Sequence, residues 1–252
     1  MLNFLYNNST RGGIMQKIQG KIRKALDEYN MIEEGDKVAV GLSGGKDSLV
    51  LLTSLAKLRR YYPKKFEMVA ITVDMHNGES DFSAIREYCG SLGVEYVVVP
   101  SQIYELLFTV RKEANPCSLC TRMRRGILSD TAIKLGCNKL ALGHHADDLI
   151  ETFFLSLFYE SRLSTFLPKT HLDRTGITMI RPMILVWEKE TITASKKMPV
   201  FFNDCPANNN TQREYVKSLL KSIEPHIHRV REHILSAILH PERNHLLDSI
   251  KI

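Results

Sequence analysis

The sequence predicts an α/β protein built on an open, mostly parallel sheet with helices on both of its faces. One observation is a series of short segments that are apolar throughout, instead of alternating with polar residues. The other is that segments with a helical spacing of apolar residues lie between them. Strands that are apolar on both faces and joined by helices are typical of parallel sheets covered by helices on both sides.

The expected elements can be placed in order along the chain. The first helix has an apolar residue at every third or fourth position, at Ile14, Ile18, Ile22, Leu26 and Tyr29. Apolar segments predict strands at 37–41, 66–73, 95–99 and 139–143. Helical patterns lie at 48–61 and 82–92. Further along we expect a strand at 178–181, a helix at 188–197, and a helical C-terminal extension at 212–239 that Pro225 interrupts.

Length and composition suit one large domain with an extension, since the chain has 252 residues, of which 44% are hydrophobic and 25% charged. The net charge of +6 favours polyanionic partners, because Lys and Arg that neutralise phosphates release condensed counterions. The alternative is that this charge only keeps the protein dissolved. Because no apolar run approaches the roughly 20 residues that span a bilayer, we expect a cytoplasmic location and no membrane partner.

A glycine-rich segment, Gly41-Leu-Ser-Gly-Gly-Lys-Asp-Ser48, follows the first expected strand and opens a helix. In this context backbone N–H groups and a helix N-terminus hold phosphate. Ser43, Gly44 and Gly45 let the backbone approach a pyrophosphate, Lys46 neutralises it, and Ser48 binds it or caps the helix. The spacing differs from that of a Walker A loop, because Val40 stands five positions before Gly45 and Asp47 follows Lys46. The alternative is a tight turn with a serine cap.

Ser43-Gly-Gly-Lys-Asp-Ser48 resembles the PP-loop of the N-type ATP pyrophosphatases, and this resemblance implies a Rossmann-like domain that splits ATP into AMP and pyrophosphate while adenylating a substrate. Asp47 then suits Mg²⁺, which typically uses one or two carboxylates together with phosphate oxygens. Asp74, directly after the second expected strand, lies in a segment that resembles the adenosine contact of these enzymes.

Leu142-Gly-His-His-Ala-Asp-Asp148 is a second strand end that enters a helix. Gly143 permits close approach to a nucleotide, and either Asp147 or Asp148 completes the magnesium site. The alternative is that these two carboxylates only interact with the helix dipole. The resemblance implies that His144, with the neighbouring His145, belongs to the nucleotide pocket.

Three of the five cysteines are candidate metal ligands. Cys117 and Cys120 form a Cys-x-x-Cys pair that we expect in a loop, and this spacing lets two thiolates bind one metal or form a redox pair. Cys205 is a third candidate, and three thiolates leave one coordination position open. Cys89 and Cys137 stand in apolar surroundings and are expected to be small buried side chains. Composition alone leaves zinc and an iron–sulfur cluster open.

The sequence from about Gln16 to Asp248 resembles the tRNA 2-thiocytidine synthetase family. The matching segments are Asn30-Met-Ile-Glu-Glu-Gly-Asp36, Pro116-Cys-Ser-Leu-Cys120, Gly143-His-His-Ala-Asp-Asp148, Arg181-Pro182, and Cys205 with Thr211-Gln-Arg-Glu214. The resemblance implies that Cys117, Cys120 and Cys205 bind a 4Fe-4S cluster. The chain departs from the family where a second Cys-x-x-Cys is expected, because Phe202 stands at the earlier position.

The resemblance also implies a reaction: ATP and Mg²⁺ adenylate the C2 oxygen of a cytidine, and cluster-carried sulfur replaces it. The family modifies position 32 of the tRNA anticodon loop. The residues implied to be catalytic are Lys46, Asp47, Asp147 and Cys205. A cysteine desulfurase or free sulfide is the expected sulfur donor, and a homodimer is an open alternative. The run Arg122, Arg124 and Arg125 places positive charge beside the cysteines, although such a run is also typical of a solvated helix face.

We therefore expect three parts: a flexible arm at 1–15, a PP-loop ATP pyrophosphatase domain at 16–200 that includes a Cys-x-x-Cys insertion, and a C-terminal segment at 201–252 with helices packed on the main domain. Two other functions stay open. One is another RNA-modifying PP-loop enzyme, such as a lysine-to-cytidine tRNA ligase, which needs no cysteine cluster. The other is a zinc-stabilised RNA-binding protein without catalysis.

Overall fold

The computed structural model describes residues 11–111, 116–201 and 212–243. The chain divides into two compact units. The first unit consists of the residues up to His145 together with a segment that begins at Leu167. The second unit consists of Ala146–Phe166 and the C-terminal helices.

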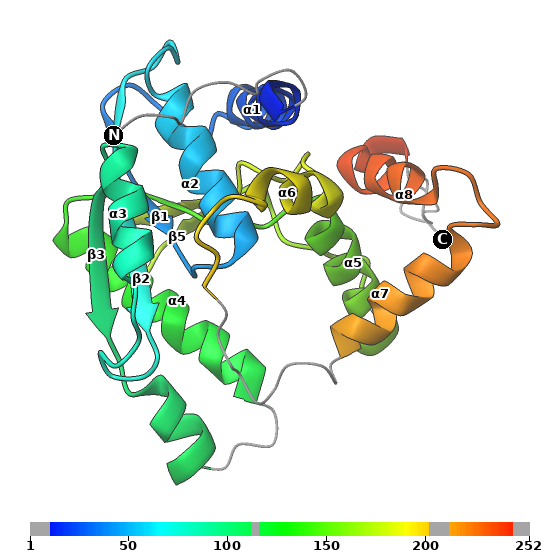
Figure 1. Ribbon diagram of the computed structural model, residues 1–252. Helices are drawn as coiled ribbons and strands as arrows, with labels where there is room; N and C mark the ends of the chain where they lie inside the picture. The colour runs from blue at the N-terminus through cyan, green and yellow to red at the C-terminus, as the bar shows by residue number, and fades with distance from the viewer. Residues whose placement is uncertain (1–10, 112–115, 202–211, 244–252) are drawn as a thin grey trace. The chain divides into compact units, whose positions relative to one another are not determined.

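A six-stranded sheet forms the centre of the first unit (Figure 1). Its strands are β1 (Asp36–Gly41), β2 (Phe66–Asp74), β3 (Glu95–Pro100), β4 (Lys139–Ala141), β5 (Lys169–Leu172) and β6 (Ile177–Ile180). They stand in the order β3-β2-β1-β4-β6-β5, and all neighbours are parallel except the β5–β6 pair. Because the order reverses between β1 and β4, loops at the carboxyl ends of these strands diverge and leave room for a ligand.

Helices cover both faces of this sheet. The helical segments of the first unit are α1 (Arg11–Glu28), α2 (Lys46–Leu58), α3 (Ser83–Ser91), the π-helix η1 (Glu105–Val110), α4 (Pro116–Lys134) and α6 (Glu188–Ser195). Helix α2 is almost entirely buried, with α1 and α6 packed against it. Helix α4 covers the other face, where its Ala132 joins a core cluster with Ala39, Ile71 and Leu140.

The structure confirms the predicted α/β class, with each expected strand and helix of the first unit present near its expected position. Several details differ, and two helical segments, η1 and α4, were not predicted. Strand β4 ends at Ala141, two residues early, and the antiparallel edge strand β5 was not expected. Helix α1 begins at Arg11, so the part of the predicted flexible arm at 11–15 is helical, while residues 1–10 lie outside the described part of the chain.

The described residues of the second unit form three helices, α5 (Ala146–Glu160), α7 (Gln212–Ile223) and α8 (Val230–Leu239), followed by a 3-10 turn at Pro241–Arg243. The predicted interruption at Pro225 separates α7 from α8. Both helices pack on α5 and bury Val216, Leu220 and Val230. Helix α5, which we had placed in the main domain, therefore belongs with the C-terminal helices.

No helix in the described ranges combines the length and the apolar composition needed to cross a lipid bilayer.

Charged pairs also join α7 to α5. Arg213 Nη1 donates to Glu151 Oε2 at 2.9 Å, and Glu151 is only 4% exposed. Burial raises the pKa of Glu151, and Arg213 opposes that rise. The Arg213 guanidinium therefore keeps a buried carboxylate charged where it would otherwise favour its neutral form.

We predict that Arg213→Gln destabilises the second unit by about 1–3 kcal/mol near pH 8, because it leaves the buried Glu151 carboxylate without its cation. The pKa of Glu151 is raised in the folded state, so this carboxyl group costs stability as the pH rises through that pKa. The destabilisation caused by Arg213→Gln should therefore be smaller at pH 5, where Glu151 is more easily protonated. Hydrogen exchange of α7 at the two pH values measures this. A loss that is equal at both pH values would contradict the role of Glu151.

Candidate functional site

The predicted phosphate loop joins β1 to the N-terminus of α2. Gly44 has a positive φ of 82°, and a Cβ atom there would lie 2.7 Å from Cβ of Phe201, so a side chain is excluded. Phe201 N–H also donates to Gly44 O at 2.9 Å. The Ser43 hydroxyl accepts from Gly45 N–H at 3.3 Å and donates to Ser48 Oγ at 3.2 Å. The loop is thus held in one conformation at the start of a helix.

The charged side chains of this loop pair with helix α6. Lys46 Nζ lies 3.0 Å from Asp47 Oδ2 and 3.1 Å from Glu188 Oε1. Thr191 Oγ1 donates to Asp47 Oδ1 at 2.5 Å. Burial alone would lower the pKa of Lys46, but these neighbouring carboxylates outweigh it and raise the pKa. Lys46 is therefore charged at neutral pH.

The segment after β4 packs directly on the phosphate loop. A Cβ atom on Gly143 would lie 3.2 Å from both the Asp47 carbonyl carbon and the Ser48 nitrogen. His145 is buried, with Nε2 3.9 Å from Asp47 Oδ1. Glycine at 143 thus lets two protein segments pack closely, and a Cβ atom there would push them apart by a few tenths of an ångström. The predicted approach of a nucleotide at Gly143 stays a prediction.

A cavity of about 240 Å³ opens at the carboxyl ends of β1, β2 and β4. Its lining includes the predicted Ser43, Asp47, Ser48, Gly143 and His144, and it is completed by Gly41, Leu42, Ile71, Val73, Arg124, Leu128 and Leu142. Polar groups from the phosphate loop therefore meet an apolar floor. This combination suits a nucleotide, with phosphates near the helix N-terminus and the base among apolar side chains.

We had predicted the Cys-x-x-Cys pair in a loop, and this was wrong: the pair lies at the start of helix α4. Cys117 is exposed, and the thiol of half-buried Cys120 lies 3.6 Å from Sδ of Met75, just beyond β2. Arg124, which lines the nucleotide cavity, follows Cys120 by four residues, a rise of about 6 Å along the same helix face. The thiols therefore lie at the same sheet edge as the cavity.

Cys205, the third predicted ligand, lies outside the described residues. In the sequence it follows Phe201 by four residues, and four extended residues span at most about 14 Å. Among the residues that the structure describes, no three His, Cys, Asp or Glu side chains gather as a metal site. The cluster ligation by Cys117, Cys120 and Cys205 stays a prediction.

Asp74 organises the turn that follows β2. Its carboxylate accepts backbone hydrogen bonds from His76 and Gly78, at 3.1 and 2.7 Å, and from the Ser80 hydroxyl at 2.7 Å. Burial alone would raise its pKa, but these hydrogen bonds outweigh burial and lower the pKa. Both carboxylate oxygens of Asp74 are thus occupied within the turn, and its contact with adenosine stays a prediction.

The two acidic residues at the start of α5 belong to the second unit. Arg231 Nη1 donates to Asp147 Oδ1 at 3.0 Å, and Arg213 Nη1 lies 3.6 Å from Asp148 Oδ1. Both carboxylates thus neutralise arginines that hold α7 and α8. Their assignment to magnesium stays a prediction.

Sequence reasoning missed Glu188 and Thr191, which fix Lys46 and Asp47. Their spacing of three residues at the start of a predicted helix was visible, but nothing local connected them with a loop more than 140 residues earlier. It also missed the position of Arg124, which lines the nucleotide cavity.

Comparison with known proteins assigns the chain to a family. A family described as a PP-loop domain matches residues 14–227. The tRNA-cytidine(32) 2-sulfurtransferase of Pelobacter propionicus is 37% identical over 240 residues, which cover 93% of this chain and 89% of that protein. The enzyme of the same name from Citrifermentans bemidjiense is 38% identical over 237 residues, 92% of this chain and 93% of that protein. The chain belongs to the tRNA-cytidine(32) 2-sulfurtransferase family.

A solved structure supports this assignment to the sulfurtransferase family at the level of the fold. The U34-tRNA thiolase NcsA from Methanococcus maripaludis, solved with its [4Fe-4S] cluster, superposes with a TM-score of 0.74 at 26% sequence identity. The match covers 98% of this chain and 85% of that chain.

We predict that alkylation of the metal-free native protein modifies Cys117 first. Cys89 and Cys137 should react at least about tenfold more slowly, because burial raises the pKa of both thiols, that of Cys89 to about 11, and the thiolate is the nucleophile. Peptide mass spectrometry over a time course measures the rates, and unfolded protein provides the control in which these three thiols react alike. Early modification of Cys137 would contradict the burial.

Proposed function

We propose that this protein is an ATP-dependent sulfurtransferase that replaces the C2 oxygen of a tRNA cytidine with sulfur, at position 32 as in the names of its relatives. The observation that supports this most directly is the continuity of helix α4. The Cys117–Cys120 pair stands at the start of that helix, and Arg124 lines the nucleotide cavity one turn later. An activated base and a sulfur-handling site would thus meet at one sheet edge.

The carbonyl oxygen on C2 of the base is a poor leaving group, and adenylation makes it a good one. The C2 oxygen would attack the α-phosphorus of ATP, and pyrophosphate would leave. Sulfide would then attack C2, and AMP would leave with the original oxygen. The phosphate loop and Lys46 would stabilise the charge that develops on the phosphates, with Asp47 holding Mg²⁺.

The observed ion pairs give Lys46 and Asp47 a resting arrangement. Lys46 is held by the carboxylates of Asp47 and Glu188, and Asp47 is held by Thr191. A bound triphosphate would replace these carboxylates as the partner of Lys46 and free an Asp47 oxygen for Mg²⁺. Glu188 and Thr191 are therefore positioning residues for the loop.

The chemistry of the donor set fits an iron–sulfur cluster. Cys117 and Cys120 are separated by three positions on one helix, so both thiols lie toward one side, and Cys205 would supply the third thiolate. When bound, a 4Fe-4S cluster held by three thiolates offers one iron without a protein ligand, where sulfide can be presented. The neighbour NcsA is named with such a cluster.

The substrate base must be unpaired to reach the cavity. A loop base can be splayed out of its stack, whereas a base inside a stem is inaccessible. The anticodon loop satisfies this requirement. We retain a cysteine desulfurase or free sulfide as the sulfur donor and a homodimer as a further proposal.

Lys46→Ala should lower tRNA thiolation by about a hundredfold or more, because it removes the cation that stabilises charge on the phosphates. Lys57→Ala is the matched control, since Lys57 is exposed at the other end of the same helix. Thiolated cytidine is measured by nucleoside mass spectrometry, and melting temperatures verify folding. Equal activity of the two variants would contradict the proposed phosphate site.

Cys205→Ala should remove both the cluster and the thiolation activity, whereas Cys137→Ala should keep both, because Cys137 is a buried core residue. The measurement is iron, sulfide and zinc content after anaerobic purification, together with thiolation of tRNA. A colourless wild-type protein with stoichiometric zinc would defeat the cluster assignment. Full activity of the Cys205 variant would defeat the sulfur path.

A further inference from the structure

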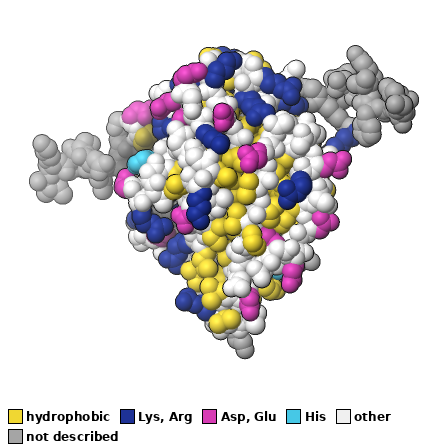
Figure 2. Space-filling model, turned by 90° about the vertical axis from the view of Figure 1, so that its left-hand side faces the viewer, with side chains coloured by type: hydrophobic (Ala, Val, Ile, Leu, Met, Phe, Trp, Pro, Cys, Tyr) yellow, Lys and Arg dark blue, Asp and Glu magenta, His cyan; other side chains and the backbone are white. Residues whose placement is uncertain are grey.

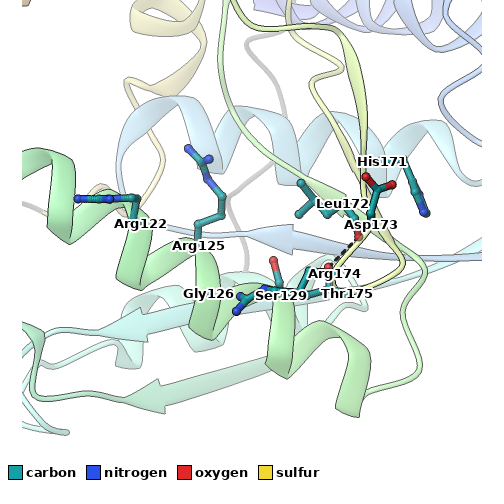
Figure 3. Close-up of a pocket in the computed structure, with 9 residues that line it drawn as sticks. All are labelled: Arg122, Arg125, Gly126, Ser129, His171, Leu172, Asp173, Arg174 and Thr175. Atoms are coloured by element: carbon teal, nitrogen blue, oxygen red, sulfur yellow. Dashed lines mark hydrogen bonds between the residues drawn. The ribbon is translucent and has the colours of Figure 1, made fainter.

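A second cavity lies on the outer side of helix α4, away from the residues that line the nucleotide cavity. Its volume is about 530 Å³, and Figure 3 shows α4 on one side of it and the end of β5 with the following turn on the other. The residues from α4 are Arg122, Arg125, Gly126 and Ser129. Those from the β5 side are His171, Leu172, Asp173, Arg174 and Thr175. We call this cavity the α4–β5 groove.

The α4 residues of the groove form one helical stripe. Their spacing is i, i+3, i+4 and i+7, which places all four on one face of the helix. Arg124 and Leu128 belong to a different face and line the nucleotide cavity instead. One helix therefore separates two cavities, and the groove has no part in binding the nucleotide.

The groove is rich in uncompensated positive charge. Arg122, Arg125 and Arg174 are exposed and form no ion pair with any carboxylate in the described ranges. Asp173 is the one acidic residue in the lining. The neighbouring Arg181 shows the effect of this charge, because burial and then Arg125 lower its pKa to about 10.

A buried hydroxyl adds a second, independent feature. Ser129 is only 3% exposed, and its Oγ has no hydrogen-bond partner in the described part of the chain. Buried polar groups are normally hydrogen-bonded, so an unpartnered hydroxyl in the lining of a cavity indicates a missing ligand or water. Cationic side chains together with a hydroxyl donor are what a phosphate oxygen requires.

We propose that the α4–β5 groove binds backbone phosphates of the tRNA substrate, with Arg125 and Arg174 contacting phosphate oxygens from opposite walls and Ser129 donating a hydrogen bond. This inference rests on the proposed function. The groove would add a binding site for the tRNA substrate, because it lies along the same helix that carries the Cys-x-x-Cys pair at its start. Ser129 follows Cys120 by nine residues, a rise of about 14 Å along α4, so a bound backbone would pass close to the reactive edge.

The shape and chemistry of the groove favour RNA over a small anion. Its volume is more than twice that of the nucleotide cavity, so it admits sugar as well as phosphate. Asp173 would repel a free phosphate, whereas in RNA it can accept a hydrogen bond from a 2′-hydroxyl. On the face in Figure 2, Lys and Arg side chains are interspersed with Asp and Glu.

The test is the double variant Arg125→Gln and Arg174→Gln in the full chain. Binding of an unmodified tRNA transcript containing cytidine 32 is measured by filter binding over a salt series. We expect the dissociation constant to rise at least about tenfold, because two charge-assisted contacts are lost. The slope of log K against log salt should fall by about one for each lost contact. Ser129→Ala should weaken binding by about tenfold, since it removes one hydrogen bond to a charged phosphate oxygen.

Arg60→Gln is the matched control. Arg60 is also an exposed arginine in a surface cavity of about 510 Å³, but that cavity contains Glu67 and Glu95 as well. This variant should bind tRNA like the wild type. In thiolation assays the KM of the double variant for tRNA should rise about as much as its dissociation constant, because the two arginines contribute to substrate binding.

Three results would overturn the assignment, and they differ in what else they affect. If the double variant and wild type bind tRNA equally while both thiolate it, the groove is not an RNA site and the proposed function stands. If inorganic pyrophosphate binds the wild type and not the double variant while tRNA binds both proteins equally, the groove is a small-anion site. If the wild type neither binds nor thiolates tRNA, the proposed function falls with the groove.

Discussion

The close packing of Gly143 on the backbone between Asp47 and Ser48 is the contact on which the site depends. A Cβ atom at 143 would lie 3.2 Å from two of these backbone atoms, so a larger residue would force the end of β4 and the start of α2 apart by a few tenths of an ångström. This contact joins the two strand ends at the point where the sheet order reverses. Gly44 plays the same part on the other side of the loop, where Phe201 fills the space of a side chain. The nucleotide cavity exists because two glycines remove the atoms that would separate these segments.

Helix α4, in the first unit, is the other element that positions the site. It is fixed on the sheet by Ala132, Leu128 and their contacts with β1, β2 and β4. Because the apolar face of α4 packs on the sheet, the side chains on its other faces point in fixed directions. Cys120 then lies against Met75, Arg124 in the nucleotide cavity, and Arg125 in the α4–β5 groove. A single rigid helix thus relates the thiols, the nucleotide and the proposed RNA contacts.

Much of this arrangement was predictable from sequence because it depends on local patterns. The phosphate loop is a contiguous segment between a buried strand and a helix, so Ser43 to Ser48 were found, although α2 begins at Lys46, two residues before the expected start. Helix α4 was not predicted. Pro116 occupies its first helical position, and three arginines interrupt its apolar spacing. Glu188 and Thr191 were missed for a different reason: their role depends on tertiary packing of α6 on α2, which no local pattern reports. The pairing of Asp147 with Arg231 is equally non-local.

The ion pairs around Lys46 explain why a phosphate loop can be ordered before ATP binds. An isolated ammonium in a half-buried loop would be destabilised by desolvation, and the carboxylates of Asp47 and Glu188 offset that cost. The same carboxylates would repel an incoming triphosphate. Mg²⁺ would resolve this conflict, because it neutralises carboxylate and phosphate charge together and would give Asp47 a new partner. With the proposed roles of Lys46 and Asp47, phosphate binding and metal binding at this loop would therefore be coupled: each would become favourable chiefly when the other occurs, and Lys46 would exchange its carboxylate partners for phosphate in the same step.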